Sequence, residues 1–391
     1  MIVLKAKRGK DKKIRNGYPN LFSDETREIL GEEKTGIANL FSYDDDFLGT
    51  GFFNRQSRKV FRLISTQAVE LNRAFFKGKI NDAVNRRRFL SDSKVRRIFN
   101  AEADLLPGLI VDQYNQYLVI QIRHPVLEDY KELIVKALRE SPGSEIEGIY
   151  ERSDFESSPE PGLKRKSGLL WGNVPEEITI VENGIKYRVS IPSGQKTGFF
   201  MDQSQTRKSA VEMVRRYQLE DEKALDLFCF TGAFSLNLGR AGMRTLGIDK
   251  SEEDIKRARE NAGLNALADR CNFEAGDVFE LQDLSTEYRL ILLDPPSLIK
   301  SKKEIHFGKR KFTEMVSKAL EFLKPPGILG ICSCAYQIGF QEIEESLRRA
   351  CSRTGCYADV IKMDIQSPDH PWLVQVPETF YLKCLWAYVR D

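Results

Sequence analysis

The fold is decided by residues 224–296. A buried strand is indicated by Ala224-Leu225-Asp226-Leu227-Phe228, and a helix after a tight turn by Thr231-Gly232-Ala233-Phe234-Ser235-Leu236-Asn237-Leu238. The next strand is Thr245-Leu246-Gly247-Ile248, which Asp249 closes, and further strand ends are predicted at Gly276-Asp277-Val278-Phe279 and Leu290-Ile291-Leu292-Leu293-Asp294-Pro295-Pro296. An acid about 20 residues past such a turn is where these folds bind a ribose. The stretch therefore predicts an α/β fold with a nucleoside-binding crevice.

The turn after the first strand also limits the cofactor. A dinucleotide fold needs G-x-G-x-x-G, so that backbone amides can approach a pyrophosphate. Here the pattern is Asp226-x-Phe228-x-x-x-Gly232, with one glycine and an acid. Such a loop is poor for a diphosphate and better for a cation that carries an amino-acid head and an adenosine. We therefore predict S-adenosylmethionine, although a single glycine after a strand is more often only structural.

Length and composition point to several globular domains. The 391 residues exceed what one core usually supports, and 41% are hydrophobic. No window approaches 18 consecutive apolar residues and the first residues do not resemble a signal peptide, so we expect a soluble, cytoplasmic protein without a membrane partner. The seven cysteines lack metal-ligand spacing and the histidines number only three, so we predict reduced thiols and no metal site.

Charge is distributed unevenly along the chain. Residues 1–100 contain 22 Lys and Arg against 12 Asp and Glu, whereas the remainder contains 38 against 45. A basic end favours binding to a polyanion through phosphate neutralisation and counterion release. A solvated basic face is the alternative interpretation.

Three segments are predicted. Residues 1–68 form a β-rich module, in which basic groups mixed with aromatics near Tyr18 and at Phe52-Phe53 suit single-stranded RNA, although these aromatics could equally be core. Residues 69–190 form a central α/β domain, with a basic helix over 68–90, a mobile loop over 153–166 and a hairpin around Asn183-Gly184. Residues 191–391 form the catalytic domain, and residues 194–203 are either a lid over the crevice or an ordinary loop.

A second informative strand lies within residues 327–336 and ends in Cys332-Ser333-Cys334. Its position places the Cys334 thiol at the carboxyl edge of the sheet, where open α/β sheets bind ligands. A strand cysteine alone is usually a small buried hydrophobe, and we assign Cys332 to the core in this way.

Next to a methyl donor, the Cys334 thiol has a chemical use. C5 of cytosine is too weak a nucleophile to take a methyl group directly, but a thiolate that adds to C6 converts the ring into an enamine whose C5 can attack a sulfonium methyl. We predict Cys334 as this nucleophile and Asp294 as the acid that assists at N3. The target cytosine must be flipped out or already unpaired.

Several motifs together carry a family resemblance. They are IRNGYP at 14–19, EADLLPGLIVD at 102–112, QKTGFFMD at 195–202, DLFCFTG at 226–232, DPPS at 294–297, SC at 333–334, DHP at 369–371, PE at 377–378 and YLK at 381–383. With them the chain resembles, over nearly its full length, the bacterial class I S-adenosylmethionine-dependent 23S rRNA cytosine-C5 methyltransferases that carry an N-terminal PUA domain.

The resemblance implies a PUA module, a central α/β domain and a Rossmann-like methyltransferase domain. It also implies that Asp249 holds the ribose hydroxyls, that Asp277 lies near the adenine, and that Asp226, Phe228, Gly232 and Asp294 complete the cofactor site. Its expected partner is 23S rRNA or a large-subunit assembly intermediate, and a homodimer is left open.

One departure from the wider RNA cytosine-C5 methyltransferases concerns the base that removes the C5 proton. Those enzymes have a second cysteine where this chain has Ser297, so the group that resolves the adduct is open. Some relatives of similar architecture methylate guanosine instead, and a guanosine methyltransferase on the same scaffold is the second hypothesis. A third is an RNA-binding assembly factor that retains the cofactor fold without turnover.

Overall fold

The computed structural model describes residues 2–90, 93–141, 145–154, 160–194, 197–281, 287–299 and 302–391. The chain forms two compact units: the first is Met1–Ile178, Val189–Met201 and Pro368–Thr379, and the second is Thr179–Arg188, Asp202–Ser367 and Phe380–Asp391. The three predicted segments remain a prediction. Within the described ranges, no helix is both long and apolar enough to cross a membrane.

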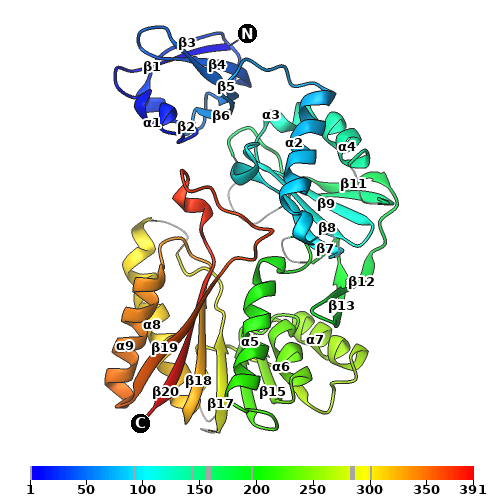
Figure 1. Ribbon diagram of the computed structural model, residues 1–391, viewed down its shortest axis with the longest axis vertical. Helices are drawn as coiled ribbons and strands as arrows, with labels where there is room; N and C mark the ends of the chain where they lie inside the picture. The colour runs from blue at the N-terminus through cyan, green and yellow to red at the C-terminus, as the bar shows by residue number, and fades with distance from the viewer. Residues whose placement is uncertain are drawn as a thin grey trace. The chain divides into compact units, whose positions relative to one another are not determined.

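The N-terminal part of the first unit is a six-stranded sheet with the order β2-β6-β5-β4-β1-β3 (Figure 1). Its elements are β1 (Ile2–Ala6), α1 (Lys12–Arg15), β2 (Asn20–Leu21), the 3-10 helix η1 (Ser23–Glu25), β3 (Thr26–Leu30), β4 (Thr35–Phe41), β5 (Phe47–Asn54) and β6 (Phe61–Ser65). The predicted β-rich module is confirmed. Phe52 and Phe53 are fully buried in hydrophobic clusters, so of the two interpretations of this pair the core one is correct and base stacking is wrong.

A five-stranded sheet with the order β11-β10-β9-β8-β7 follows in the same unit. Its elements are α2 (Arg73–Arg86), η2 (Arg88–Leu90), β7 (Val95–Asn100), η3 (Ala101–Asp104), β8 (Leu109–Tyr114), β9 (Tyr117–Ile122), α3 (Val126–Asp129), α4 (Lys131–Arg139), β10 (Gly148–Arg152) and β11 (Ser167–Gly172). Helix α2 begins later than predicted because the Asn72 side chain caps it by accepting from the Phe75 backbone N–H. It runs through the exposed Gly78 without a break. Part of the predicted loop 153–166 lies outside the described residues.

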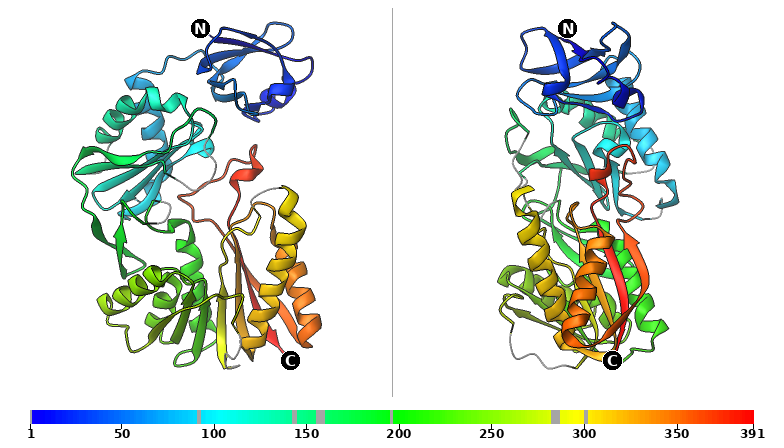
Figure 2. Two further views of the ribbon diagram at one scale, coloured as in Figure 1. Left: turned by 180° about the vertical axis from the view of Figure 1, so that it is seen from behind. Right: turned by 90° about the vertical axis from the view of Figure 1, so that its left-hand side faces the viewer.

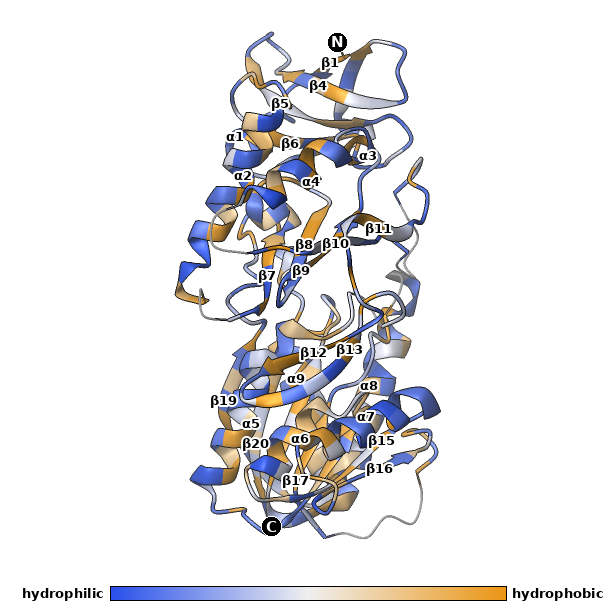
Figure 3. Cartoon of the chain, turned by 90° about the vertical axis from the view of Figure 1, so that its right-hand side faces the viewer, coloured by the Kyte–Doolittle hydropathy of each residue, from blue (hydrophilic) through white to orange (hydrophobic). Residues whose placement is uncertain are grey.

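The predicted hairpin is confirmed as β12 (Glu177–Glu182) and β13 (Ile185–Ser190). Asn183 and Gly184 have φ of 51° and 77°, as a tight hairpin turn requires. Buried and exposed residues alternate along both strands. Figure 3 shows that β13 contains both hydrophobic and hydrophilic residues.

The second unit contains a seven-stranded sheet with the order β16-β15-β14-β17-β18-β20-β19. Its strands are β14 (Lys223–Leu227), β15 (Arg244–Asp249), β16 (Cys271–Ala275), β17 (Tyr288–Leu293), β18 (Leu323–Ser333), β19 (Tyr357–Ile365) and β20 (Lys383–Arg390). Strands β14 to β18 are parallel to one another, and β20 runs antiparallel between β18 and β19. The strand order reverses beside β14, which is where open α/β sheets form a ligand crevice.

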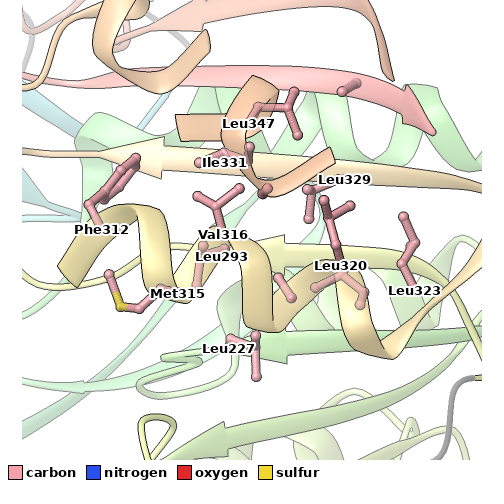
Figure 4. Packing of buried hydrophobic residues seen from close by; sticks show 14 of the residues in the cluster. Leu227, Leu293, Phe312, Met315, Val316, Leu320, Leu323, Leu329, Ile331 and Leu347 are labelled. Carbon is pink, nitrogen blue, oxygen red and sulfur yellow. The ribbon is translucent and has the colours of Figure 1, made fainter. Parts of the chain in front are cut away.

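Helices cover both faces of this sheet, as the opposite views of Figures 1 and 2 show. They are α5 (Ser204–Arg216), α6 (Ala233–Arg240) and α7 (Glu252–Leu264) on one face and α8 (Ile305–Phe322) and α9 (Phe340–Thr354) on the other, with 3-10 helices η4 (Met201–Gln203), η5 (Lys302–Glu304) and η6 (Pro377–Thr379) elsewhere in the chain. The apolar side chains of α8 pack on β14, β17 and β18 (Figure 4). The predicted α/β class with a class I methyltransferase fold is confirmed.

Candidate active site

The parallel strands of the second unit end at one edge of the sheet. Leu227 pairs with Ile248 and with Leu293, and Leu293 pairs with Ile331, so the ends of β14, β15, β17 and β18 lie level. Asp249 pairs with Ala275 at the end of β16. The predicted residues follow these ends: Asp226, Phe228 and Gly232 at β14, Asp249 at β15, Asp277 after β16, Asp294 after β17 and Cys334 after β18. The structure thus brings all seven to the same edge.

The loop between β14 and α6 has an unusual backbone. Phe228, Phe230 and Gly232 have φ of 65°, 50° and 82°. A positive φ at a bulky residue costs about 1–3 kcal/mol, and such strain gathers at functional sites. The backbone N–H of Gly232 donates to the Cys229 carbonyl oxygen at 2.9 Å. This loop is therefore a tight turn whose strained backbone is held by the surrounding structure, and it lies where the strand order of the sheet reverses.

The ring of Phe273 on β16 supports this loop from below. A Cβ at Gly232 would lie 2.7 Å from the Phe273 ring, and a Cβ at Gly247 on β15 would lie equally close to it. Both distances are too short for a real carbon contact. The two glycines therefore make room for one aromatic side chain of the edge strand.

Asp226 is buried beneath the loop and is only partly satisfied. Its Oδ2 accepts from the Ser235 backbone N–H at 3.0 Å and from the Ser235 hydroxyl at 2.7 Å. Its Oδ1 is buried and has no hydrogen-bond partner among the residues that the structure describes. Burial raises the pKa of Asp226 to about 6, against the lowering effect of the Ser235 bonds. An unpaired buried carboxylate oxygen suits a cationic ligand.

Asp249 orders the same loop from the neighbouring strand. Its two oxygens accept from the backbone N–H groups of Phe230 and Ser251, each at 3.1 Å. A carboxylate has lone pairs left for two hydroxyl groups. Asp277 is exposed, and its side chain accepts from the Phe279 backbone N–H at 2.9 Å.

Gln203 is a functional candidate that sequence reasoning missed. Its Nε2 donates to Asp294 Oδ2 at 3.0 Å, and its Oε1 is buried without a partner in the described part of the chain. The only signal was its place at the end of the predicted lid. That lid stays a prediction, because Gln195 and Lys196 lie outside the described residues.

Cys334 is half-buried at the end of β18, and its Sγ lies 4.0 Å from the Pro295 carbonyl oxygen. The next residue along the chain from Asp294 therefore contacts the thiol. Cys332 is fully buried opposite Cys384 on β20, which confirms its assignment to the core. Ser297, where a second cysteine would stand, is exposed.

The loop fits S-adenosylmethionine on three grounds. The free Oδ1 of Asp226 suits an ammonium group, the Asp249 carboxylate suits ribose hydroxyls, and the acids around the loop disfavour a diphosphate. When bound, the cofactor supplies an electrophilic methyl group. These roles are expectations that follow from the geometry.

Two family models match this chain, one near the N-terminus and one in the C-terminal half. Residues 4–66 match the family model for a PUA-like domain, and residues 219–375 match the model for a methyltransferase domain. Two solved structures share the fold over 99% of this chain and 100% of theirs, at 24% identity. They are SMU.776, a candidate methyltransferase complexed with SAH, with a TM-score of 0.83, and a candidate SAM-dependent methyltransferase from Streptococcus mutans, with a TM-score of 0.82.

The fold and these matches define a class I methyltransferase with an N-terminal PUA-like domain, and they indicate S-adenosylmethionine as its cofactor. The ribosomal RNA large subunit methyltransferase I of Pseudoalteromonas atlantica is 31% identical over 388 residues, 96% of each chain. That of Shewanella amazonensis is 32% identical over 401 residues, 99% of each chain. The chain belongs to the ribosomal RNA large subunit methyltransferase I family.

The raised pKa of Asp226 predicts a pH-dependent cofactor affinity. Below pH 6 the carboxyl is mostly protonated and attracts an ammonium group weakly, whereas above pH 6 it is ionised. We expect the affinity for S-adenosylhomocysteine, measured by calorimetry, to rise about tenfold from pH 5 to pH 7. Asp226→Asn should bind more weakly and lose this dependence. Asp254→Asn, which removes another carboxyl whose pKa burial raises, should keep it.

Proposed function

We propose that this protein transfers a methyl group from S-adenosylmethionine to C5 of a cytidine in 23S rRNA through a covalent adduct between Cys334 and C6. The observation that carries the proposal is the meeting of the Cys334 thiol and the Asp294 loop at the ends of two adjacent parallel strands. Direct methylation of a ring nitrogen would need no thiol there.

The residues of the chain have separate tasks in this reaction. The thiolate of Cys334 forms the bond to C6, while the Asp294 carboxyl donates a proton at N3, which leaves C5 nucleophilic. Gln203 holds the Asp294 carboxyl in place through its amide. After methylation, a base or water removes the C5 proton, which restores the C5–C6 double bond and expels the thiolate, and the N3 proton returns to the Asp294 carboxylate. The cofactor supplies the methyl group for the middle step.

Two further observations support RNA of the large ribosomal subunit as the substrate. The relatives' shared name specifies large-subunit rRNA. In the N-terminal module, a cation lies over two aromatic rings: Lys13 Nζ, which also pairs with Glu25, is 5.1 Å from the Tyr18 ring centre and 4.4 Å from that of Phe22. Half-buried rings beside cations suit both phosphates and unstacked bases.

The deciding experiment is methyl transfer from labelled S-adenosylmethionine to unmodified 23S rRNA, followed by nucleoside analysis. Free rRNA and a large-subunit precursor particle should be tested side by side. Label in 5-methylcytidine supports the proposal. Label in a guanosine would support the second hypothesis, and cofactor binding without any labelled RNA would support an assembly factor.

A further inference from the structure

A buried lysine, Lys383, contacts the turn that begins at Cys334. Lys383 is the first residue of β20 and pairs with Ser333, the residue before Cys334. Since β20 is antiparallel to β18, this start of β20 lies at the same sheet edge as the end of β18. Lys383 is only 1% exposed. The sheet register therefore places Lys383 opposite Ser333, one residue before the candidate nucleophile.

The Lys383 ammonium group is held by backbone oxygens. Its Nζ donates to the carbonyl oxygens of Ala335 at 3.0 Å, Ile338 at 3.1 Å and Tyr381 at 2.9 Å. Two of these acceptors belong to the turn that begins at Cys334. No carboxylate lies within 4.0 Å of this ammonium group among the described residues. Three donations to neutral oxygens fix the direction of the side chain and leave its positive charge unneutralised.

A buried cation without a carboxylate partner is costly, and its surroundings show what compensates. Burial lowers the pKa of Lys383 to about 8, while the negative charges of Cys334 and Glu342 act to raise it. Glu342 is already engaged with Lys309 at 3.0 Å and with the Gly339 backbone N–H at 2.9 Å. The Phe380 ring lies 5.3 Å from Nζ. Of the two negative charges that act on the lysine, that of Cys334 has the larger effect on its pKa.

We propose that Lys383 is a positioning residue for Cys334, whose buried ammonium group fixes the turn after the cysteine and stabilises the thiolate form of its side chain. The proton of the thiol passes to solvent, and no other reactant is required. A neighbouring lysine is one of the environments that make protein thiols reactive. This inference rests on the proposed function in one respect: the proposed reaction is what uses the Cys334 thiolate.

The test measures thiol reactivity without RNA. Cys334 and Cys356 are the two cysteines that are not buried, so a Cys356→Ser background leaves Cys334 as the accessible thiol. Alkylation of Cys334 by iodoacetamide is followed by mass spectrometry from pH 6 to pH 10. In this background the midpoint of the pH dependence of alkylation should lie below the pKa of an ordinary cysteine, roughly 8.5. A midpoint at or above that value overturns the proposal without any lysine variant.

Lysine variants then separate charge from structure. Lys383→Met should shift the midpoint upward by about one unit and slow alkylation at pH 7 about tenfold, whereas Lys383→Arg should restore most of the reactivity. Lys383→Gln, which keeps two donors but no charge, should behave like Lys383→Met. A midpoint that stays unchanged in the uncharged variants, with only a uniform change in rate, assigns Lys383 a purely structural role and overturns the proposal.

Failure of this inference is distinguishable from failure of the proposed function. The alkylation profile is independent of the methylated base, so a guanosine product would leave it unchanged. Conversely, 5-methylcytidine formation with an unshifted Cys334 profile would support the proposed reaction and reject Lys383. S-adenosylhomocysteine binding, measured for each variant, checks that the second unit is folded.

Discussion

Replacing Cys334 by alanine is expected to lower methyl transfer to 23S rRNA by about three orders of magnitude or more, because without the thiolate C5 of cytosine stays too weak a nucleophile. Cofactor affinity should be unchanged, since Cys334 lies at the end of β18 and the cofactor loop follows β14. Single-turnover methylation with labelled S-adenosylmethionine measures the first effect, and calorimetry with S-adenosylhomocysteine the second.

Cys356→Ala is the matched control, because it removes the other half-buried thiol and should leave activity intact. A transcript containing 5-fluorocytidine adds a direct test of the covalent bond. Fluorine at C5 cannot leave as a proton does, so the adduct should persist under denaturing conditions with the native protein and be absent with Cys334→Ala. Retained methylation by Cys334→Ala would refute covalent catalysis.

The second large effect concerns stability. Arg207 on α5 and Glu182 at the end of β12 form a buried bidentate ion pair, with both N–O distances 2.7 Å and side-chain exposures of 1% and 7%. Burial alone would lower the pKa of Arg207, but the charge and hydrogen bonds of Glu182, together with the charges of Tyr187 and Asp202, outweigh it and the pKa is raised. Arg207→Met should reduce the free energy of unfolding by about 3–5 kcal/mol, because Glu182 is left buried and unpaired.

Urea unfolding with tryptophan fluorescence can measure this change. The chain has three tryptophans, and Trp386 is fully buried in the second unit, so a Trp171→Phe/Trp372→Phe background makes it the reporter. Adding Glu182→Leu to Arg207→Met should recover much of the loss. The control Arg216→Met breaks an exposed pair with Glu212 at 3.8 Å and should cost less than about 1 kcal/mol. Equal losses in both variants would contradict the prediction.

Sequence patterns predicted the features that depend on neighbouring residues. The buried strand at Lys223–Leu227 and the turn at Gly232 are visible because their hydrophobic runs and turn residues are contiguous. Because parallel strands end at one edge, the predicted strand ends also indicated that Asp249, Asp294 and Cys334 would lie at that edge.

Other features depend on residues brought together only by folding. Gln203 contacts Asp294 across 91 positions of sequence, and Lys383 reaches the Ala335 carbonyl across 48. Neither residue type suggests its role by itself. Likewise, β5 is buried along nearly its whole length, although its aromatic residues, considered alone, were also compatible with an exposed RNA-binding surface. Such contacts form only when segments distant in the sequence pack together, and local sequence patterns do not specify that packing.

The ring of Phe273 has a consequence for how the family can vary. Edge strands usually accept substitutions easily, but here one edge side chain occupies the space that Gly232 and Gly247 leave open. A larger residue at position 247 would require a smaller one at position 273, so these positions should change together among homologues. Substitutions at the edge of the sheet would therefore change the conformation of the cofactor loop without replacing any residue that contacts the cofactor.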